Sequence, residues 1–275
     1  MVRSSKMIIA DWNPVAFTLG SLTVRWYGIM VSLAVLTIFV TMLRESRRLG
    51  ISEEMLYNLF LFGMLGGLVM SRVVHVVDRM VLNPGLPVDW FGFDGLGLYG
   101  AIVGVPLSAF IYTRVAHIPW SSMARVGDAV ALGAPLGQAI GRVGCFINGC
   151  CHGGPTDLPW GVVYQHPESF AEYPGIPVHP AQLYLIAWNL VVFAVVFLMR
   201  KRPKPDGASF LIYLILYAAG DFAIRFFRTN SPYAIGLQQS QLIGLGIIAV
   251  CAPILVMKWR NFRREAPASD ASVES

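Results

Sequence analysis

Charged residues are scarce in this chain. They make up 13% of its 275 residues, against about a quarter in soluble domains. Hydrophobic residues make up 55%, and the mean hydropathy is +0.59. Cysteine is scarce too, with only four residues, which excludes a small scaffold built on disulfides. The composition therefore excludes an ordinary soluble domain and favours an integral membrane protein.

The chain also lacks a long basic run, although its formal charge is +5. The basic side chains stand in short clusters after every second apolar stretch, which argues against nucleic-acid binding and is typical of cytoplasmic loops. This bias predicts an N-terminus outside and a C-terminus inside. We expect no cleavable signal peptide, because Asp11, Asn13 and Pro14 make the opening too polar. The clusters contain Arg44, Arg47 and Arg48, then Arg114 and Arg125, then Arg200, Lys201, Arg202 and Lys204, then Lys258, Arg260, Arg263 and Arg264.

Apolar stretches near the length of about 20 residues that a membrane helix needs occupy most of the chain. We predict an all-α integral membrane fold with seven transmembrane helices, at 22–43, 55–77, 96–115, 128–146, 180–199, 208–227 and 238–258. They form one domain over 1–262, with an outer-side loop at about 147–179 and a disordered cytoplasmic tail at 263–275. The fourth stretch is rich in glycine and alanine, which allow close approach, so we expect it to be the central helix.

The segment from Gly141 to Gly153 carries the most chemistry. It brings a cation, an amide, three thiols and an imidazole close together in the sequence. The predicted topology places polar side chains of six helices at the same outer depth. Polar groups at that depth are costly and mark functional sites. We therefore expect a site for a charged, lipid-sized substrate in the outer leaflet.

Six motifs, in order, carry a resemblance to a known family. They are residues 11–28 (DWNPVAFTLGSLTVRWYG), Gly66-Gly67 with Arg72, 94–104 (DGLGLYGAIVG), 134–149 (APLGQAIGRVGCFING), 179–184 (HPAQLY) and 226–228 (FFR). The chain resembles the prolipoprotein diacylglyceryl transferases. The resemblance implies a multi-pass enzyme of the bacterial inner membrane, with its active site toward the periplasmic side. It also implies transfer of a diacylglyceryl group from phosphatidylglycerol to the lipobox cysteine of a preprolipoprotein, with release of glycerol phosphate.

The chain departs from the family pattern at several positions. Tyr99 stands where most of the family has histidine. Cys145 and Cys150 replace an amide and a carboxylate of the signature, and Leu185 replaces a glutamate. Asp221 and Arg225 exchange the usual signs of two charges four residues apart. Because residues four apart share a helix face, this exchange predicts an inverted ion pair.

Arg142 is the leading candidate site residue, because a guanidinium can hold a phosphate diester through two hydrogen bonds and stabilise a leaving phosphate. The alternative for the arginines is a structural ion pair or an interfacial anchor. For Asn148 the alternative is a turn, and for the tyrosines it is an aromatic belt. We expect catalytic roles for Arg142, Tyr27, Tyr99 and Asn148, and substrate binding by Arg142, Arg225, Arg228, Gly100, Gly104, His179 and Gln182.

The cysteines leave four interpretations open. Cys145, Cys150 and Cys151 can fill space, since a free thiol packs as a small hydrophobe, or form a disulfide at an oxidising face. A thiol activated by Arg142 and His152 can act as a nucleophile. Together with His152 the thiols also offer zinc ligands, although adjacent ligands are geometrically awkward. Our primary expectation is no metal and no cofactor.

Three functions compete on this sequence. The first is the diacylglyceryl transfer just described, with phosphatidylglycerol, a lipobox segment and the bilayer as partners and no nucleic acid. The second is a paralogous transferase with the same lipid donor and another acceptor. The third is a non-catalytic lipid-binding or redox membrane protein, which the altered signature residues favour more than the resemblance alone does.

Overall fold

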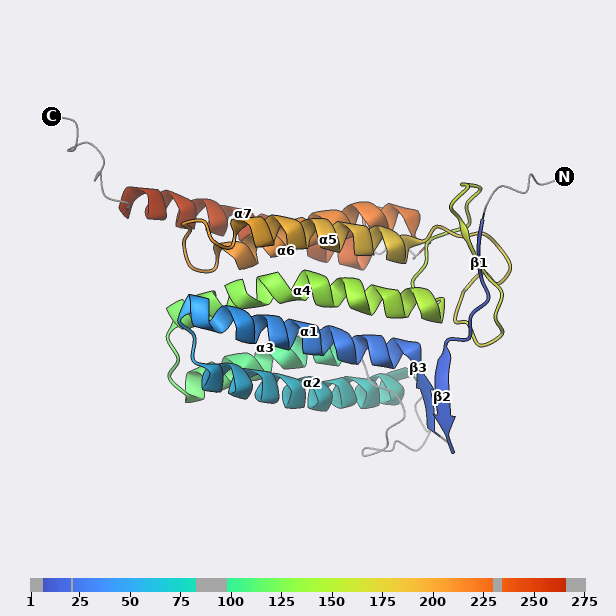
Figure 1. Ribbon diagram of the computed structural model, residues 1–275, viewed down its shortest axis with the longest axis horizontal. Helices are drawn as coiled ribbons and strands as arrows, with labels where there is room; N and C mark the ends of the chain where they lie inside the picture. Colours follow the sequence, from blue (N-terminus) through green and yellow to red (C-terminus); the bar gives the residue numbers. More distant parts are fainter. Residues whose placement is uncertain (1–6, 21, 83–97, 230–233, 266–275) are drawn as a thin grey trace. The chain divides into compact units, whose positions relative to one another are not determined.

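The structure is a computed structural model that describes residues 7–20, 22–82, 98–229 and 234–265. Within these ranges it contains seven α-helices, one 3-10 turn and four short strands (Figure 1). The helices are α1 (Trp26–Leu49), α2 (Glu53–Leu82), α3 (Leu98–Val115), α4 (Trp120–Asn148), α5 (Ala181–Met199), α6 (Ala208–Ile224) and α7 (Gln239–Glu265), and the 3-10 turn is η1 (Arg225–Phe227). The strands are β1 (Ile8–Ala10), β2 (Val15–Leu19), β3 (Leu22–Arg25) and β4 (Val162–Tyr164).

Six helical segments are long and apolar enough to cross a membrane: α1, α2, α4, α5, α6 with η1, and α7. In α3 the apolar stretch is shorter, over Val103–Val115, and the start of the predicted span 96–115 lies outside the described residues. The chain is thus a mostly helical membrane protein. The segment between α4 and α5 contains residues 149–180, and the outer-side position of the loop at 147–179 stays a prediction.

Residues 22–25 were predicted to begin the first membrane helix, and this prediction is wrong. They form β3, which pairs antiparallel with β2, and α1 begins only at Trp26. The β-branched Thr23 and Val24 favour a strand, and Gly20, with φ of +59°, supplies the left-handed residue before it. The fold therefore adds two small sheets to its helices. At the other end α7 continues to Glu265, and residues 266–275 of the predicted tail lie outside the described residues.

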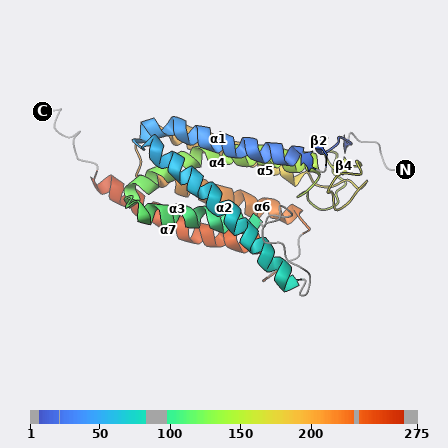
Figure 2. The same ribbon diagram turned by 90° about the horizontal axis from the view of Figure 1, so that it is seen from below.

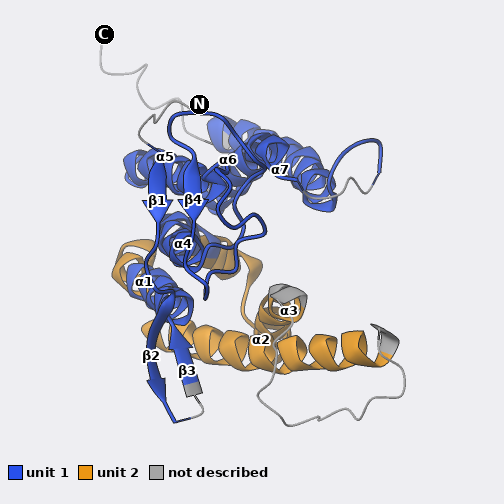
Figure 3. Cartoon of the chain, turned by 90° about the vertical axis from the view of Figure 1, so that its right-hand side faces the viewer, with its two compact units in different colours: residues 1–42, 127–275 blue, residues 43–126 orange. Residues whose placement is uncertain are grey.

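The chain divides into two compact units (Figure 3). The first contains residues 1–42 and 127–275, and the second contains residues 43–126. The second unit holds α2 and α3, which pack closely because their glycines face one another. A Cβ at Gly104 would meet the backbone of Gly66, and a Cβ at Gly100 would meet the backbone of Met70.

Helix α4 is the central helix of the first unit, as its small residues predicted. Half of its most apolar window is buried, against 11–28% in the other candidate spans. On one side Gly133 and Gly137 admit Ile38 of α1, where a Cβ would lie within 3.0 Å of that side chain or its backbone. On the other side Leu132 and its neighbours form a core with Val192 of α5 and Tyr213 of α6. Figures 1 and 2 both show α4 beside α1.

A loop of residues 149–180 covers one end of these helices (Figure 1). Strand β4 of this loop pairs in parallel with β1 from the start of the chain. The two strands surround a small buried core of Ala10, Val162, Tyr164 and Val178. The loop is therefore a packed layer, and it lies where α4 ends and α1 and α5 begin.

Candidate functional site

Arg142 lies two turns before the end of α4 and is half-buried. Its Nη1 donates to the Cys145 sulfur at 4.0 Å. Its guanidinium also lies close to the Tyr217 hydroxyl and the Asp221 carboxylate, both on α6, and interacts electrostatically with them. Arg142 thus faces side chains of its own helix and of α6.

Tyr27, from the first turn of α1, reaches the same place. Its ring packs over Gly144, where a Cβ would lie 3.4 Å from Tyr27 Cδ2. It interacts electrostatically with Arg142 and with the cysteines that follow α4. With 39% of its surface exposed, Tyr27 lies at the open side of the site. The structure therefore brings two of the predicted catalytic residues, Arg142 and Tyr27, together.

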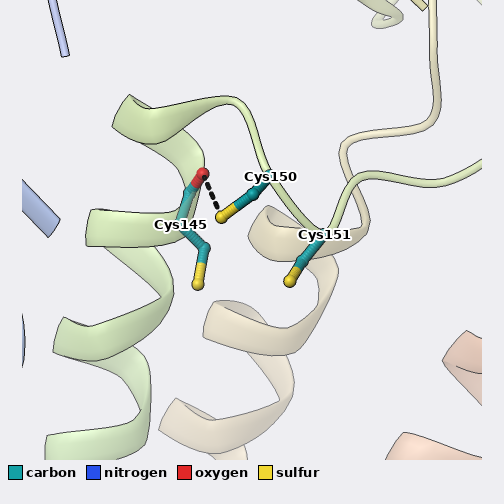
Figure 4. A group of neighbouring side chains, drawn as sticks. All are labelled: Cys145, Cys150 and Cys151. Atoms are coloured by element: carbon teal, nitrogen blue, oxygen red, sulfur yellow. Dashed lines mark hydrogen bonds between the residues drawn. The ribbon is translucent and has the colours of Figure 1, made fainter. Parts of the chain in front are cut away.

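The end of α4 is a Schellman motif. The N–H of Gly149 donates to the carbonyl of Phe146 at 3.3 Å, and the N–H of Cys150 donates to the carbonyl of Cys145 at 3.2 Å. Gly149 has the left-handed φ of +77° that this motif requires. The motif folds residue 150 back onto residue 145, so the Cys150 sulfur lies 3.8 Å from the Cys145 carbonyl oxygen (Figure 4).

Cys151 continues the turn in an unusual backbone conformation. Its φ is +63°, a region that residues with a side chain seldom occupy. Adjacent residues of an extended chain point to opposite sides, but here Cys151 points to the same side as Cys150 (Figure 4). The sulfurs of Cys145, Cys150 and Cys151 all lie within 4.8 Å of one another. All four cysteines of the chain are free thiols.

The three sulfurs differ in exposure and acidity. Cys145 is buried, Cys150 is half-buried and Cys151 is exposed. Hydrogen bonds from Cys145 and Cys150 lower the pKa of the Cys151 thiol, desolvation opposes them, and the positive charges of Arg142 and Arg228 assist them. Three sulfurs at this spacing suit a soft metal ion, and Cys151 as a thiolate suits a nucleophile or an acid–base group.

Two side chains from other elements hydrogen-bond the backbone carbonyls of this turn. Gln182 Nε2 donates to the Cys150 carbonyl at 2.8 Å, and Arg228 Nη2 donates to the Cys151 carbonyl at 2.8 Å. Gln182 is fully buried, and its Oε1 has no hydrogen-bond partner among the described residues. The contacts of Gln182 favour a positioning role over the substrate binding predicted for it.

Asn148 is buried and faces the cysteines. Its Nδ2 donates to the Cys150 sulfur at 3.6 Å, and its Oδ1 accepts from Arg25 Nη1 at 3.3 Å. Arg25 in turn pairs with Glu168 at 3.2 Å. Asn148 is thus the last residue of α4 and contacts a thiol, and its catalytic role stays a prediction.

His152 and His179 belong to the loop framework. His152 Nδ1 lies 2.7 Å from the Gly153 carbonyl, and its Nε2 accepts from the N–H of Glu172 at 3.0 Å. Both ring nitrogens of His152 are thus occupied, and the predicted partnership with the thiols is not formed. His179 Nδ1 lies 3.3 Å from the Tyr184 hydroxyl, and the His179 ring packs on Phe227.

The charge exchange on α6 produces the predicted ion pair. Arg225 Nε lies 2.7 Å from Asp221 Oδ2, and both side chains are mostly buried. Arg225 therefore has its charge compensated within the protein. Arg228 is different, because its Nε is buried without a hydrogen-bond partner among the described residues. Of the two, Arg228 is better prepared to receive a phosphate oxygen.

Tyr99, Gly100 and Gly104 lie on α3, in the second unit. The structure shows Gly100 and Gly104 as close-packing positions against α2. Helix packing alone therefore accounts for glycine at these two positions, and no ligand is needed to explain it. The side chain of Tyr99 lies outside the described residues.

Sequence reasoning missed Tyr217, which interacts with Arg142 from α6. A signal was present, since Tyr217 precedes Asp221 by four residues and so shares its helix face. It also missed the direct contact of Gln182 with the cysteine turn. No sequence pattern relates residues 150 and 182, so this contact could be identified only from the structure.

Comparison with known proteins finds similar sequences over most of the chain. A family model described as prolipoprotein diacylglyceryl transferase matches residues 14–257. A protein of Dehalococcoides mccartyi named phosphatidylglycerol–prolipoprotein diacylglyceryl transferase is 38% identical over 253 residues, covering 90% of this chain and 95% of the relative. Proteins of the same name from Clostridioides difficile and Nitrosomonas europaea are 36% and 30% identical, covering 86% and 92% of this chain and 93% and 92% of those relatives.

Proposed function

Because the chain belongs to the prolipoprotein diacylglyceryl transferase family, we propose that it transfers a diacylglyceryl group from phosphatidylglycerol to the lipobox cysteine of a preprolipoprotein. The observation that carries this proposal is the position of Arg142 on the buried central helix, beside Tyr27, Tyr217 and a group of thiols. A fixed cation at the end of an apolar helix suits a substrate with a phosphate head and acyl chains.

Arg142 binds the phosphate of the lipid donor. Its low hydration strengthens a contact with an anion, and its planar guanidinium matches two phosphate oxygens. Arg228 adds a second positive group through its unpartnered Nε. Because Asp221 neutralises Arg225, Arg225 positions the end of α6 and contributes less to phosphate binding.

The reaction replaces one bond at the glyceryl methylene carbon. The acceptor sulfur forms a C–S bond while the C–O bond to the phosphate breaks, and the electron pair of that bond passes to the phosphate oxygen. The thiol proton passes to solvent before attack, and glycerol phosphate departs with its new negative charge. Arg142 stabilises that charge as it develops, which is the step where a positioned cation lowers the barrier most.

The site faces the outside of the bacterial inner membrane. This orientation rests on the basic clusters, which gather at the opposite ends of the predicted spans from Arg142 and the 149–180 loop. Acyl chains enter laterally from the outer leaflet, and the lipobox segment approaches from the side of the loop.

The direct test uses purified protein in detergent, phosphatidylglycerol labelled in its headgroup glycerol, and a synthetic lipobox peptide. We expect a gain in peptide mass together with released glycerol phosphate, and neither product with a peptide whose cysteine is serine. Arg142→Ala should lower the rate by about 10²–10³, the usual cost of losing a charge-stabilising donor. Arg260→Ala, an exposed site on α7, is the matched control and should keep full activity.

If Arg142→Ala matches the unaltered protein, Arg142 is not the phosphate ligand. If headgroup release occurs only when another thiol, amine or alcohol replaces the peptide, the lipid donor stands and the acceptor is different. If a characterised family member is active in the same assay and this protein releases no glycerol phosphate with any acceptor, the proposed transfer is wrong.

A further inference from the structure

We propose that Cys145, Cys150 and Cys151 form a three-thiolate zinc site whose open fourth position binds the thiol of the acceptor. This proposal rests on the proposed function, because it names how that function activates its acceptor. Its first support is the convergence of the three sulfurs within 4.8 Å (Figure 4). Zn–S bonds of about 2.3 Å in a tetrahedron place the sulfurs about 3.8 Å apart, so small side-chain rotations complete the site.

The second support is the backbone that produces this convergence. Adjacent cysteines normally diverge, and this turn prevents it with two left-handed residues, Gly149 at φ +77° and Cys151 at φ +63°. The conformation of Cys151 is costly for a residue with a side chain. Gln182 and Arg228 hold it in place through the carbonyls of residues 150 and 151. Simple space filling by thiols does not require such a turn.

The third support is the charge around the sulfurs. Three thiolates and one Zn²⁺ carry a net charge of −1, and Arg142 donates to the Cys145 sulfur from 4.0 Å. Asn148 donates an N–H to the Cys150 sulfur at 3.6 Å. Hydrogen bonds of this kind support metal-bound sulfurs from outside the coordination sphere. His152 does not complete the site, because both its ring nitrogens are engaged by the backbone.

The fourth position determines the function of the metal. Zinc with three protein ligands keeps one position for water or substrate, and a thiol that coordinates zinc loses its proton. The acceptor thiol therefore binds as a thiolate and releases its proton to solvent. Its sulfur attacks the glyceryl carbon as the C–O bond breaks, while zinc keeps its oxidation state. Arg142 holds the donor phosphate beside that sulfur. The glyceryl carbon of the donor therefore lies next to the acceptor thiolate.

The test measures metal binding and activity separately on the full chain in detergent under reducing conditions. Chelated protein receives Zn²⁺ for metal analysis and Co²⁺ for its thiolate-to-metal absorption. We expect one ion per chain, and loss of that ion in Cys145→Ser, Cys150→Ser and Cys151→Ser. Cys251→Ser is the matched control, because Cys251 lies on α7 outside the cluster, and it should bind the metal normally.

Addition of the lipobox peptide should then change the Co²⁺ spectrum, whereas the peptide with serine should not. We also expect chelation to lower transfer at least about tenfold, the scale on which altered metal sites lose activity, and Zn²⁺ to restore it. The inference is overturned by absent metal binding, by binding that survives replacement of all three cysteines, or by a protein mass that shows a disulfide among them.

The remaining outcomes separate the two proposals. A protein that transfers lipid equally well after chelation refutes the zinc site and leaves the transferase function intact. A protein that binds one metal and responds to the peptide thiol, but releases no glycerol phosphate, refutes the transferase function and leaves the thiol-binding metal site.

Discussion

The Cys150 thiol lies 3.8 Å from the carbonyl oxygen of Cys145, five residues earlier in the chain. This contact is a direct product of the Schellman motif that ends α4, in which the sixth residue folds back over the first. In this motif the same two positions often make an apolar contact, and here they bring two sulfurs together. The cysteine group therefore depends on Gly149, which lies between Cys145 and Cys150 and permits the turn.

Gly149→Ala should disrupt this turn. A side chain at φ +77° costs about 1 kcal/mol or more, and its Cβ would also collide with Ser169 Oγ. We expect a lower melting temperature in detergent and faster maleimide labelling of Cys150. Gly175→Ala is the control, because Gly175 has φ of +74° and open space around its Cβ. Equal melting shifts in the two variants would show that the collision with Ser169 has no consequence.

The ion pair between Asp221 and Arg225 should behave as a coupled unit. Breaking a mostly buried pair leaves an uncompensated charge, so Asp221→Asn or Arg225→Gln should each destabilise the protein by about 3 kcal/mol. The double variant Asp221→Arg with Arg225→Asp restores the pair in the opposite order and should recover most of that loss in thermal unfolding. A double variant that is no more stable than the two single variants would mean that the two residues do not interact.

Alkylation of the metal-free thiols should follow their exposure. Cys151 is exposed, Cys150 is half-buried, and Cys145 and Cys251 are buried. Hydrogen bonds from Cys145 and Cys150 also lower the pKa of Cys151, which increases its thiolate fraction. Limited treatment with a maleimide, followed by peptide mass mapping, should therefore modify Cys151 first. Modification of Cys145 before Cys151 would contradict the geometry of the turn.

Asp128 should stabilise the start of α6 in the first unit. Its carboxylate accepts from the N–H groups of Gly207 at 2.8 Å and Phe210 at 3.1 Å, and so caps the start of α6 from α4. Asp128→Ala should lower stability by about 1–2 kcal/mol, as the loss of a helix cap does. Asp157→Ala, an exposed carboxylate in the loop, should leave the melting temperature unchanged. A similar shift in both variants would indicate a general effect of charge.

Much of the helical architecture was predictable from the sequence. Apolar length gave the helices, and the small residues of the fourth stretch correctly identified α4 as the central helix. The strand at residues 22–25 was missed because three apolar or β-branched residues, Leu22, Thr23 and Val24, stand directly before the apolar stretch of α1. Only the pairing with β2 distinguishes this strand from the start of α1. Strand pairing depends on two segments, so it cannot be predicted from one of them alone.

The site was predictable where its contacts are local. The interval of five residues between Cys145 and Cys150, with Gly149 between them, is the sequence pattern of a Schellman motif, and the Asp221–Arg225 pair follows from helix periodicity. The direction of the Cys151 side chain was not predictable, because it depends on a left-handed φ at a residue other than glycine. The hydrogen bonds from Gln182 and Arg228 stabilise that conformation, and both come from distant parts of the chain.

The groups around the cysteine turn make hydrogen bonds to its backbone carbonyls. Gln182 contacts the carbonyl of residue 150, Arg228 contacts the carbonyl of residue 151, and the helix end is closed by the carbonyl of residue 145. None of these three contacts uses a side chain of the turn. The same backbone can therefore carry an amide, a carboxylate or a thiol at these positions without refolding. Such a scaffold allows the side-chain chemistry of this turn to diverge during evolution while the helix that holds Arg142 stays in place.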